Sequence, residues 1–294
     1  MRSPDLGAEA EALSDLFAVE LLPGWRAWLE HFSRAASTYA EFQLSLSRQH
    51  LAFVTLGKGD DHLARIESHL REIHIGDAGR RTLADLQRAV PTATWGVKTS
   101  LSTAPAVHVY VKKPLPVADV LSWLGSHGTQ AEQQQRIAQI SAVLDKSYTH
   151  FFGLGLAPEA APAFDLYFTQ YSEGNGQVAQ RITQLCDVLE IPEQQRRLFD
   201  MHHPVLSRPG QTVWVSVGVI DGALQPAIKL DYAGVPLRVA MQLADDLGLS
   251  ADTRERLRRL PATFDVHTAS YLGWRLQARP TLGLYFTRRR RSVL

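Results

Sequence analysis

Short runs in which apolar and polar side chains alternate occur in pairs along the chain. The clearest pair lies in Ser147–Tyr171, where an aromatic-rich run and the alternating run Phe164–Tyr171 flank the Pro/Ala-rich connector Ala157–Pro162. Alternation is typical of a β-strand with two different faces, and two such runs around a connector predict a β-hairpin. The pattern recurs at regular intervals and predicts four further hairpins, in Tyr39–Leu56, Thr94–Pro114, Thr212–Gly234 and Ser270–Arg289.

Apolar residues at helical spacing occupy the segments between the hairpins. They predict helices over Ala8–Leu22, Gly24–Ser37, Asp61–Ile73, Arg80–Ala89, Val117–Leu124, Thr129–Asp145, Gln177–Glu190, Pro192–His202, Val235–Leu247 and Ser250–Leu260. The order is β-β-α-α repeated, and the N-terminal helix pair replaces the pair missing after the last hairpin. Because such hairpins can close on themselves and remove exposed sheet edges, we expect an α+β fold in one domain. It would be a barrel of about ten antiparallel strands ringed by α-helices, spanning residues 1–294.

The two faces of the predicted strands differ in chemistry. The apolar face suits packing beneath amphipathic helices. It carries Val107, Val109, Val111, Phe164, Leu166, Phe168, Ile228, Leu230, Leu282, Leu284 and Phe286. The other face carries His108, Tyr110, Lys112, Asp165, Tyr167, Thr169, Lys229, Asp231, Gly283, Tyr285 and Thr287. A sheet with one face in solvent would show the same alternation, but the richness in Tyr, Lys and His favours a solvent-filled lumen.

Composition argues against several classes of protein. The 294 residues carry a formal net charge of +1, so the chain lacks the basic field that nucleic-acid binding requires. The single cysteine, Cys186, excludes an intramolecular disulfide and a cysteine-based metal cage. No apolar run approaches about 18 residues, and the first residues show no export signal. We therefore expect a cytoplasmic protein without a membrane span, working as a monomer.

On these hairpins the chain resembles the ABBA prenyltransferases, a family named for its α-β-β-α order, whose antiparallel strands enclose a solvent-filled reaction chamber. The resemblance covers nearly the whole chain. It is strongest to the cyanobactin-type branch, which prenylates ribosomal cyclic peptides, in YAEFQLSLS, VHVYVKKP and YLGWRLQARPTLGLYFTRR. It implies transfer of a dimethylallyl or geranyl group from its diphosphate to an electron-rich side chain of a peptide, with Mg²⁺ as cofactor. An aromatic branch of similar size, acting on small phenols or indoles, is the alternative.

Cationic and phenolic side chains lie on the presumed inner face of several strands. Splitting a prenyl diphosphate needs cations around the leaving group and an environment that shields an allyl cation from water. Tyrosine rings can provide that shield through their π-faces. A single Lys or Arg at a strand end is often merely solvated, so the prediction concerns the set. We expect the diphosphate to be bound by Lys98, Lys112, Lys229, Arg275, Tyr110, Tyr167 and Tyr285.

Glu41 is the expected catalytic base. It lies on the polar face of Tyr39–Ser47, and the resemblance aligns it with the glutamate that takes a proton from the acceptor. A glutamate paired with a neighbouring lysine is the simpler alternative. On the lumen face, His108, Trp214 and Gln277 are expected to line the pocket for the prenyl group and the acceptor.

The first hairpin departs from the family pattern. The family has an arginine on its second strand that helps to hold diphosphate. Here the corresponding place falls near Val54–Thr55, and the nearest cations are Arg48, His50 and Lys58.

Other candidate sites are weaker. Asp165 and Asp231 could orient a lysine or bind Mg²⁺ with the diphosphate, but isolated carboxylates are not a metal signature. The chain has no aspartate-rich DDxxD box. We expect Met201–His203 to form a surface cap and Arg288–Arg291 to be a solvated terminus. A carrier of lipids or aromatic ligands remains a competing class, and it predicts an apolar lumen.

Overall fold

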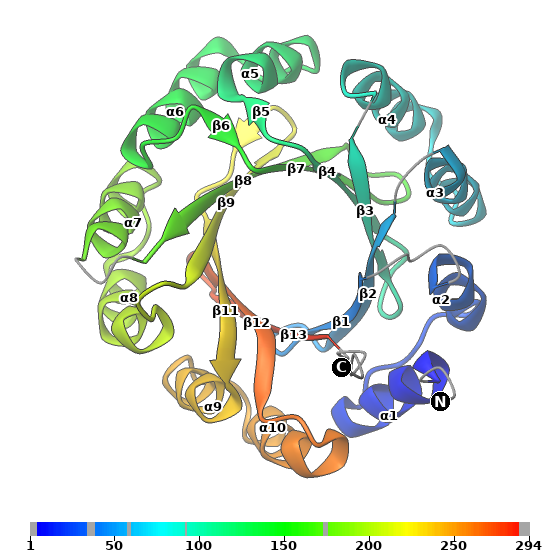
Figure 1. The fold of residues 1–294 in the computed structure, drawn as a ribbon, viewed down its shortest axis with the longest axis vertical. Coiled ribbons are helices and arrows are strands. Elements are labelled where there is room, and N and C mark those ends of the chain that lie inside the picture. The colour runs from blue at the N-terminus through cyan, green and yellow to red at the C-terminus, as the bar shows by residue number, and fades with distance from the viewer. Residues whose placement is uncertain (1–4, 34–38, 58–59, 92, 173–175, 288–294) are drawn as a thin grey trace, which may run out of the picture.

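The computed structural model describes residues 5–33, 39–57, 60–91, 93–172 and 176–287. Within these ranges, ten antiparallel strands close into a barrel and ten helices surround it (Figure 1). The barrel strands are β1 (Tyr39–Ser45), β2 (His50–Gly57), β3 (Thr94–Ser100), β4 (Val107–Lys112), β7 (Phe151–Leu156), β8 (Ala163–Tyr171), β9 (Thr212–Ile220), β11 (Ile228–Pro236), β12 (Thr268–Leu276) and β13 (Thr281–Thr287). The helices are α1 (Leu6–Phe17), α2 (Trp25–Ser33), α3 (Asp60–Glu72), α4 (Asp77–Ala89), α5 (Val117–Ser126), α6 (Ala131–Val143), α7 (Gln177–Val188), α8 (Glu193–Leu206), α9 (Leu237–Asp246) and α10 (Ala251–Phe264).

The barrel closes because the first and last hairpins pair. β1 lies antiparallel to β13, with Gln43 opposite Tyr285, and β8 lies antiparallel to β9. A short strand, β10 (Ala223–Leu224), pairs antiparallel with the end of β9. Outside the barrel sheet, β5 (Leu115–Pro116) pairs with β6 (Tyr148–Thr149). The predicted barrel, the alternation of hairpins and helix pairs along the chain, and the helix ring are therefore confirmed. So is the role of the N-terminal helices, since α1 packs against α10. In the described part of the chain, no helix combines the length and apolarity needed to cross a bilayer.

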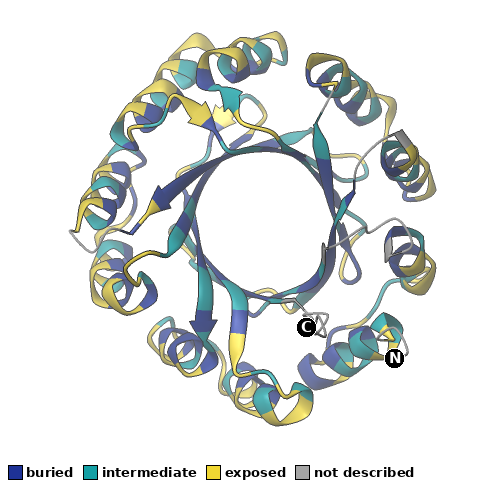
Figure 2. Cartoon of the chain, viewed as in Figure 1, coloured by how far each residue is buried: buried dark blue, intermediate teal, exposed yellow. Residues whose placement is uncertain are grey.

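The hydrophobic core is a sleeve between the barrel and the helices. The predicted apolar strand face forms its inner layer: Val109, Leu166 and Leu284 are fully buried. Figure 2 shows the matching pattern in the helices, which are buried toward the barrel and exposed on their outer side. Burying one such side chain contributes roughly 1.5–3 kcal/mol. Because the apolar faces pack outward against the helices, the polar strand faces are left to line the lumen.

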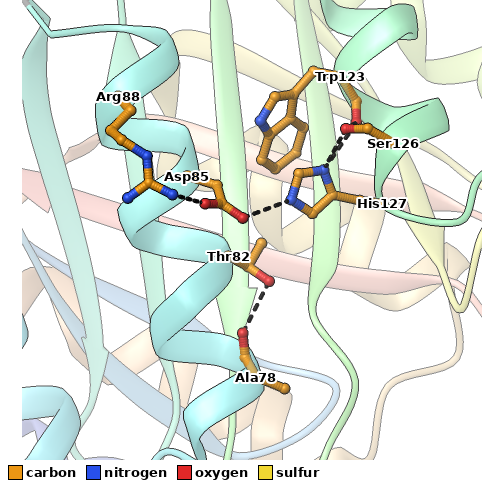
Figure 3. A network of polar contacts seen from close by, with 7 residues as sticks. All are labelled: Ala78, Thr82, Asp85, Arg88, Trp123, Ser126 and His127. Atoms are coloured by element: carbon orange, nitrogen blue, oxygen red, sulfur yellow. Dashed lines mark hydrogen bonds and ion pairs between the residues drawn. The ribbon is translucent and has the colours of Figure 1, made fainter.

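Polar contacts tie neighbouring helix pairs together where α4 meets α5. His127 Nε2 lies 3.6 Å from Asp85 Oδ2, and Asp85 also pairs with Arg88 (Figure 3). The His127 ring stacks on Trp123 with centroids 3.9 Å apart. Ser126 Oγ contacts His127 Nδ1 at 3.1 Å but donates to the Trp123 carbonyl at 2.7 Å, as a residue ending a helix does. The network therefore connects two helices, and its exposed Asp85–Arg88 pair adds up to about 1 kcal/mol.

Two helices run past the ends that the sequence predicts. α8 continues beyond His202 through Pro204, and α10 continues beyond Leu260 through Pro261. Each proline lies in the last turn, where it removes only one backbone hydrogen bond. For α8 the loss is offset because Leu206, which follows the proline, is buried in the core.

The first helix ends earlier than predicted, at Phe17 rather than Leu22. Ala18 adopts a left-handed conformation with φ of 47°, which ends the helix. The Leu22 amide then donates to the Leu101 carbonyl at 2.8 Å, and this bond holds the following segment against the barrel. The second predicted helix is confirmed as far as Ser33, and its remaining residues lie outside the described ranges.

The predicted surface cap at Met201–His203 is wrong. Met201 is exposed, but His202 and His203 are buried inside α8. His202 Nε2 lies 2.8 Å from Asp246 Oδ2 of α9. His203 Nδ1 lies 2.9 Å from the Tyr232 hydroxyl of β11. The two histidines therefore connect α8 to its neighbours, because the helix does not end before Pro204.

Buried neutral histidines predict a loss of stability in mild acid. Burial lowers the pKa of His69 and of His203 to about 4, below the ordinary 6.5. The unfolded chain therefore binds protons more tightly than the folded chain, so the free energy of unfolding falls as the pH drops from about 6.5 toward 4. Between pH 7 and pH 5 we expect about 2 kcal/mol of loss per histidine, measured by urea unfolding. The variant His203→Gln should reduce this slope, whereas His267→Gln, at an exposed position, should leave it unchanged. If the free energy of unfolding fell equally with pH in the parent, His203→Gln and His267→Gln proteins, His203 would not be the source of the loss.

Candidate active site

The polar strand faces point into the barrel, as predicted. Side chains of paired residues share a face, and the register pairs Lys98 with His108 and Lys229 with Arg275. Together with Tyr167 and Gln277, these four residues help to line one cavity of about 1030 Å³. Six of the site residues predicted from sequence are therefore brought together in a single space.

The cavity opens at the barrel end where the connectors within the hairpins lie, which we call the turn end. Its lining includes connector residues that are exposed to solvent, among them Arg48, Ala161 and Ala278. The opposite end, where the strands connect to the helices, is called the helix end.

Lys229 forms the centre of a polar network in the cavity. Its Nζ donates to Asp231 Oδ2 at 2.6 Å and to the Tyr285 hydroxyl at 2.9 Å. Both the lysine and the aspartate are largely shielded from solvent. The ion pair holds the lysine in one orientation, with its remaining donor capacity facing the cavity.

Positive charge exceeds negative charge in this half of the lumen. Lys98 makes no hydrogen bond or ion pair within the described residues, and its charge interacts at longer range with Lys229 and Arg275. Three cations thus face two carboxylates, Asp165 and Asp231. A surplus of positive charge in a confined cavity favours an anionic ligand, and a diphosphate would supply the missing negative charge.

The same electrostatics predict how anion binding depends on pH. Burial and the charge of Lys229 lower the pKa of Lys98 to about 8. Lys98 is therefore charged below pH 8 and loses its proton above it, so diphosphate affinity should be constant from pH 6.5 to 7.5 and fall toward tenfold per unit above pH 8. Calorimetric titration with dimethylallyl thiolodiphosphate measures this. The variant Lys98→Arg keeps its charge and should remove the fall near pH 8; an unchanged profile would refute the role of Lys98.

His108 lies beside the cations as a neutral side chain. Its Nε2 is 3.3 Å from Asp165 Oδ2, and its ring stacks on Tyr110 at 4.6 Å. Burial, reinforced by Lys98, holds its pKa well below the ordinary value. A Cβ atom on the facing Gly153 would collide with this ring. The glycine therefore makes room for the histidine inside the barrel.

Three tyrosines, Tyr110, Tyr167 and Tyr285, form a belt across the middle of the lumen. The Tyr110 and Tyr167 rings meet edge to face at 5.9 Å, and Lys229 Nζ lies 5.3 Å from the Tyr285 ring centroid. Burial raises the pKa of all three well above the ordinary value. They remain neutral phenols, so each can donate a hydrogen bond and present a π-face.

An aromatic cluster of His150, Phe151, Trp214 and Tyr271 lies on the helix-end side of this belt. Phe151 stacks on Trp214 at 4.8 Å, and His150 meets the same indole edge-on at 4.8 Å. The Trp214 indole also hydrogen-bonds Tyr271. The four rings pack on one another. They lie outside the hydrophobic core, and each of them is partly exposed. Trp214 thus faces the lumen, as predicted.

Glu41 and Lys112 also belong to the helix-end half. Glu41 shares its strand face with Gln43, which lines the cavity, and its charge acts on Lys112 and Tyr271. Glu41 is also one of the residues that line a separate cavity of about 420 Å³ between the barrel and α1 and α10. Lys112 Nζ lies 4.8 Å from the Phe151 ring centroid. The structure therefore does not bring Lys112 together with Lys98, Lys229 and Arg275.

Sequence reasoning missed three lumen residues, His150, Phe151 and Tyr271. Phe151 and Tyr271 stand at positions that alternate with Gly153 and Gly273, so the two-residue period could have found them. His150 precedes the strand, and its place could not be derived from that period.

The structure shows what replaces the arginine missing from the first hairpin. Val54 pairs with both Glu41 and Lys98, so an apolar side chain occupies that lumen position. Arg48 and His50 instead line the cavity mouth. Burial and Lys98 lower the pKa of His50 to about 4, so Arg48 is the charged one of the pair at neutral pH. Lys58 lies outside the described ranges.

The lumen offers Mg²⁺ few ligands of its own. Among the described residues, no three acidic, His or Cys side chains come close enough to hold a metal ion. One oxygen is available: Asp231 Oδ1 is buried without a hydrogen-bond partner. Mg²⁺ in proteins often takes only one or two carboxylates and completes its shell with water and substrate phosphates. These residues therefore fit Mg²⁺ only together with a diphosphate.

No protein-family model matches the chain, and no curated protein matches it either. Solved structures do. 5-Dimethylallyltryptophan synthase from Streptomyces coelicolor is 16% identical with a TM-score of 0.64, and the match covers 96% of this chain and 95% of that one. 6-Dimethylallyltryptophan synthase from Micromonospora olivasterospora, solved with DMASPP and Trp, is 14% identical with a TM-score of 0.66, covering 96% of each chain. The prenyltransferase PriB is 14% identical with a TM-score of 0.64, covering 94% of this chain and 93% of that one. These neighbours are ABBA-type aromatic prenyltransferases, and the likeness establishes the fold.

Proposed function

We propose that the protein transfers a dimethylallyl or geranyl group from its diphosphate to an electron-rich aromatic side chain. The observation that carries this proposal is the layered lumen. Lys98, Lys229 and Arg275 lie on one side of the tyrosine belt, and Glu41 lies on the other. The solved complexes of the neighbours with a donor analogue and tryptophan support the same reading.

Each layer has one role in the proposed reaction. The three cations bind the diphosphate, and as the bond between prenyl C1 and oxygen breaks, its electron pair leaves with the diphosphate, which they stabilise. The tyrosine belt shields the allyl cation, with each ring contributing about 1–2 kcal/mol. The acceptor carbon then bonds to C1, and Glu41 takes the proton that this carbon loses. Aromaticity is thereby restored and the charges balance.

We infer that the acceptor is an aromatic residue of a ribosomal, cyclic peptide, of the cyanobactin type. Two tyrosines at the helix end, Tyr148 and Tyr171, are 54% and 60% exposed. Exposed tyrosines are typical of surfaces that contact a protein or peptide. A free indole or phenol is the second candidate, because the neighbours were solved with tryptophan. His108, Trp214 and Gln277 keep their proposed role in the prenyl and acceptor pocket.

Diphosphate release tests the proposal directly. The protein is incubated with dimethylallyl or geranyl diphosphate and either tryptophan or a cyclic hexapeptide containing one Trp and one Tyr. Release should depend on the acceptor, and the product should gain the mass of the prenyl group. A higher kcat/KM for the hexapeptide supports the peptide assignment. A carrier would bind the donor and release no diphosphate, and this result would overturn the proposal.

For magnesium we propose a role as counter-ion of the donor, which Asp231 Oδ1 could help to hold. Because three cationic side chains already face the diphosphate, EDTA should raise the donor KM several-fold and leave kcat within about twofold. Steady-state kinetics with and without EDTA, with Mg²⁺ added back, measure both constants. A kcat that vanishes with EDTA and returns with Mg²⁺ would show instead that the metal is essential to the chemical step.

We also propose that the protein works as a cytoplasmic monomer. Closure of the barrel leaves no full-length strand edge in the described sheet for a second copy to extend. Light scattering measures the mass in solution.

A further inference from the structure

In the part of the chain that the structure describes, the two ends of the lumen differ in chemistry. The residues that line the large cavity include Lys98, Lys229 and Arg275, and the cavity opens at the turn end. Its mouth is lined by small side chains such as Ala160, Ala161 and Ala278, together with Arg48 and His50. This end therefore suits an anion that needs several positive charges around it.

The aromatic cluster reaches solvent by a different route. Phe151, Trp214 and Tyr271 are only partly buried, yet none of them lines the cavity that opens at the turn end. They point into the barrel, because they pair with the inward-facing residues Tyr167, Thr169 and Tyr285. They lie on the helix-end side of the tyrosine belt, where Tyr171 at the end of β8 is 60% exposed. Among the described residues, the cluster therefore lies toward the helix end.

The tyrosine belt lies between the two ends of the lumen. Tyr167 and Tyr285 are 7% and 8% exposed, and the hydrogen bond from Lys229 holds Tyr285 in place. Of the belt, only Tyr167 lines the large cavity. An acceptor arriving from the turn end would have to pass the cations and the tyrosine belt to reach Glu41.

We propose that the two substrates enter the barrel from opposite ends: the prenyl diphosphate from the turn end and the aromatic acceptor from the helix end. The acceptor ring then lies against Trp214 and Phe151, with Glu41 and Lys112 beside it. This inference rests on the proposed prenyl transfer. It predicts that each substrate binds without hindrance from the other, and that the diphosphate can leave while the acceptor stays bound.

Blocking each end separately tests the inference. The only cysteine, Cys186, is fully buried and burial raises its thiol pKa to about 12, so it will not react with a maleimide. A single new thiol is placed at the helix end by Tyr171→Cys, or at the turn end by Ala161→Cys. Tyr171 is exposed and follows the inward-facing Thr169 by two residues, and Ala161 is an exposed lining residue of the cavity mouth. Each variant is compared before and after labelling with a polyethylene glycol maleimide.

Three measurements are made on each protein: the Kd of dimethylallyl thiolodiphosphate by calorimetry, the acceptor KM with tryptophan, and the acceptor KM with the cyclic hexapeptide. Labelled Tyr171→Cys should keep its donor Kd within about twofold and lose at least tenfold in acceptor kcat/KM. Labelled Ala161→Cys should lose at least tenfold in donor affinity and keep its acceptor kcat/KM within about twofold. A larger loss with the hexapeptide than with tryptophan at the helix end indicates a peptide acceptor, and equal losses indicate a small aromatic one.

The inference is overturned if the turn-end label weakens donor binding and lowers acceptor kcat/KM together, while the helix-end label changes neither quantity. Both substrates would then use one opening. Failure of the proposed function gives a different result, since the unlabelled protein would then bind no donor analogue or release no diphosphate. Strictly ordered binding in product-inhibition kinetics of the unlabelled protein would also contradict independent entry.

Discussion

Replacing Glu41 by glutamine is expected to lower kcat by about 10²–10⁴-fold, the range usual for loss of a general base. The amide keeps the size and the hydrogen-bonding reach of the side chain but cannot take the proton that the acceptor carbon loses. Glu41 is 5% exposed and lies in the helix-end half of the lumen, where its charge acts on Lys112 and Tyr271. The donor Kd should therefore stay within about twofold, because the cations proposed to bind the diphosphate are untouched.

Single-turnover kinetics with saturating donor separate the chemical step from binding. The variant Glu132→Gln makes the same change of charge on the outer helix α6, at an exposed position, and should keep the parent kcat. If Glu41→Gln retained at least a third of the parent kcat, the proton would have another acceptor and the assigned base would be wrong.

The second large effect is expected from Lys98→Met, which should raise the donor KM and the diphosphate Kd by about 10–100-fold. A hydrogen bond to a charged group contributes about 1.5–3 kcal/mol, and Lys98 makes no competing ion pair within the described residues. Its removal therefore subtracts one cation from the donor site and leaves no carboxylate unpaired. Lys229 is a poorer test, because its loss would strand Asp231 in a buried position.

Lys112→Met is the matched comparison. This lysine lies over Phe151 on the other side of the belt, so its loss should leave the diphosphate Kd unchanged and raise the acceptor KM. Calorimetry with inorganic diphosphate and with dimethylallyl thiolodiphosphate measures the first quantity without any acceptor. Equal effects of the two variants on diphosphate binding would mean that Lys112 also binds the diphosphate, as the sequence pattern alone predicts. That result would contradict the layered lumen.

The buried faces of the strands were predictable because successive side chains along a β-strand point to opposite faces. A one-residue error would have moved every apolar side chain from the core to the lumen, so the alternation in Val107–Lys112 or Phe164–Tyr171 leaves little ambiguity. The repeat of hairpins and helix pairs likewise indicated a closed barrel, since only closure covers every edge. Candidate residues such as Tyr110, Lys229 and Arg275 followed from the same parity and lie in the lumen.

Other local predictions failed where packing outweighed a local signal. Proline predicts the end of a helix, yet α8 continues through Pro204 because burial of Leu206 offsets one lost backbone hydrogen bond. The adjacent His202 and His203 were expected at the surface; instead His202 contacts Asp246 of α9, and His203 hydrogen-bonds Tyr232 of β11. Neither outcome can be derived from the segment itself, because the compensating contacts come from other elements.

The sequence by itself determined which side of each strand faces the lumen, and with it the chemistry available there. Only the tertiary structure decided how far along the barrel axis each side chain lies. Alternation says nothing about that height, which depends on how ten tilted strands are shifted against one another when the sheet closes. That shift places Lys98 among the cations and Lys112, on the neighbouring strand, among the aromatic rings.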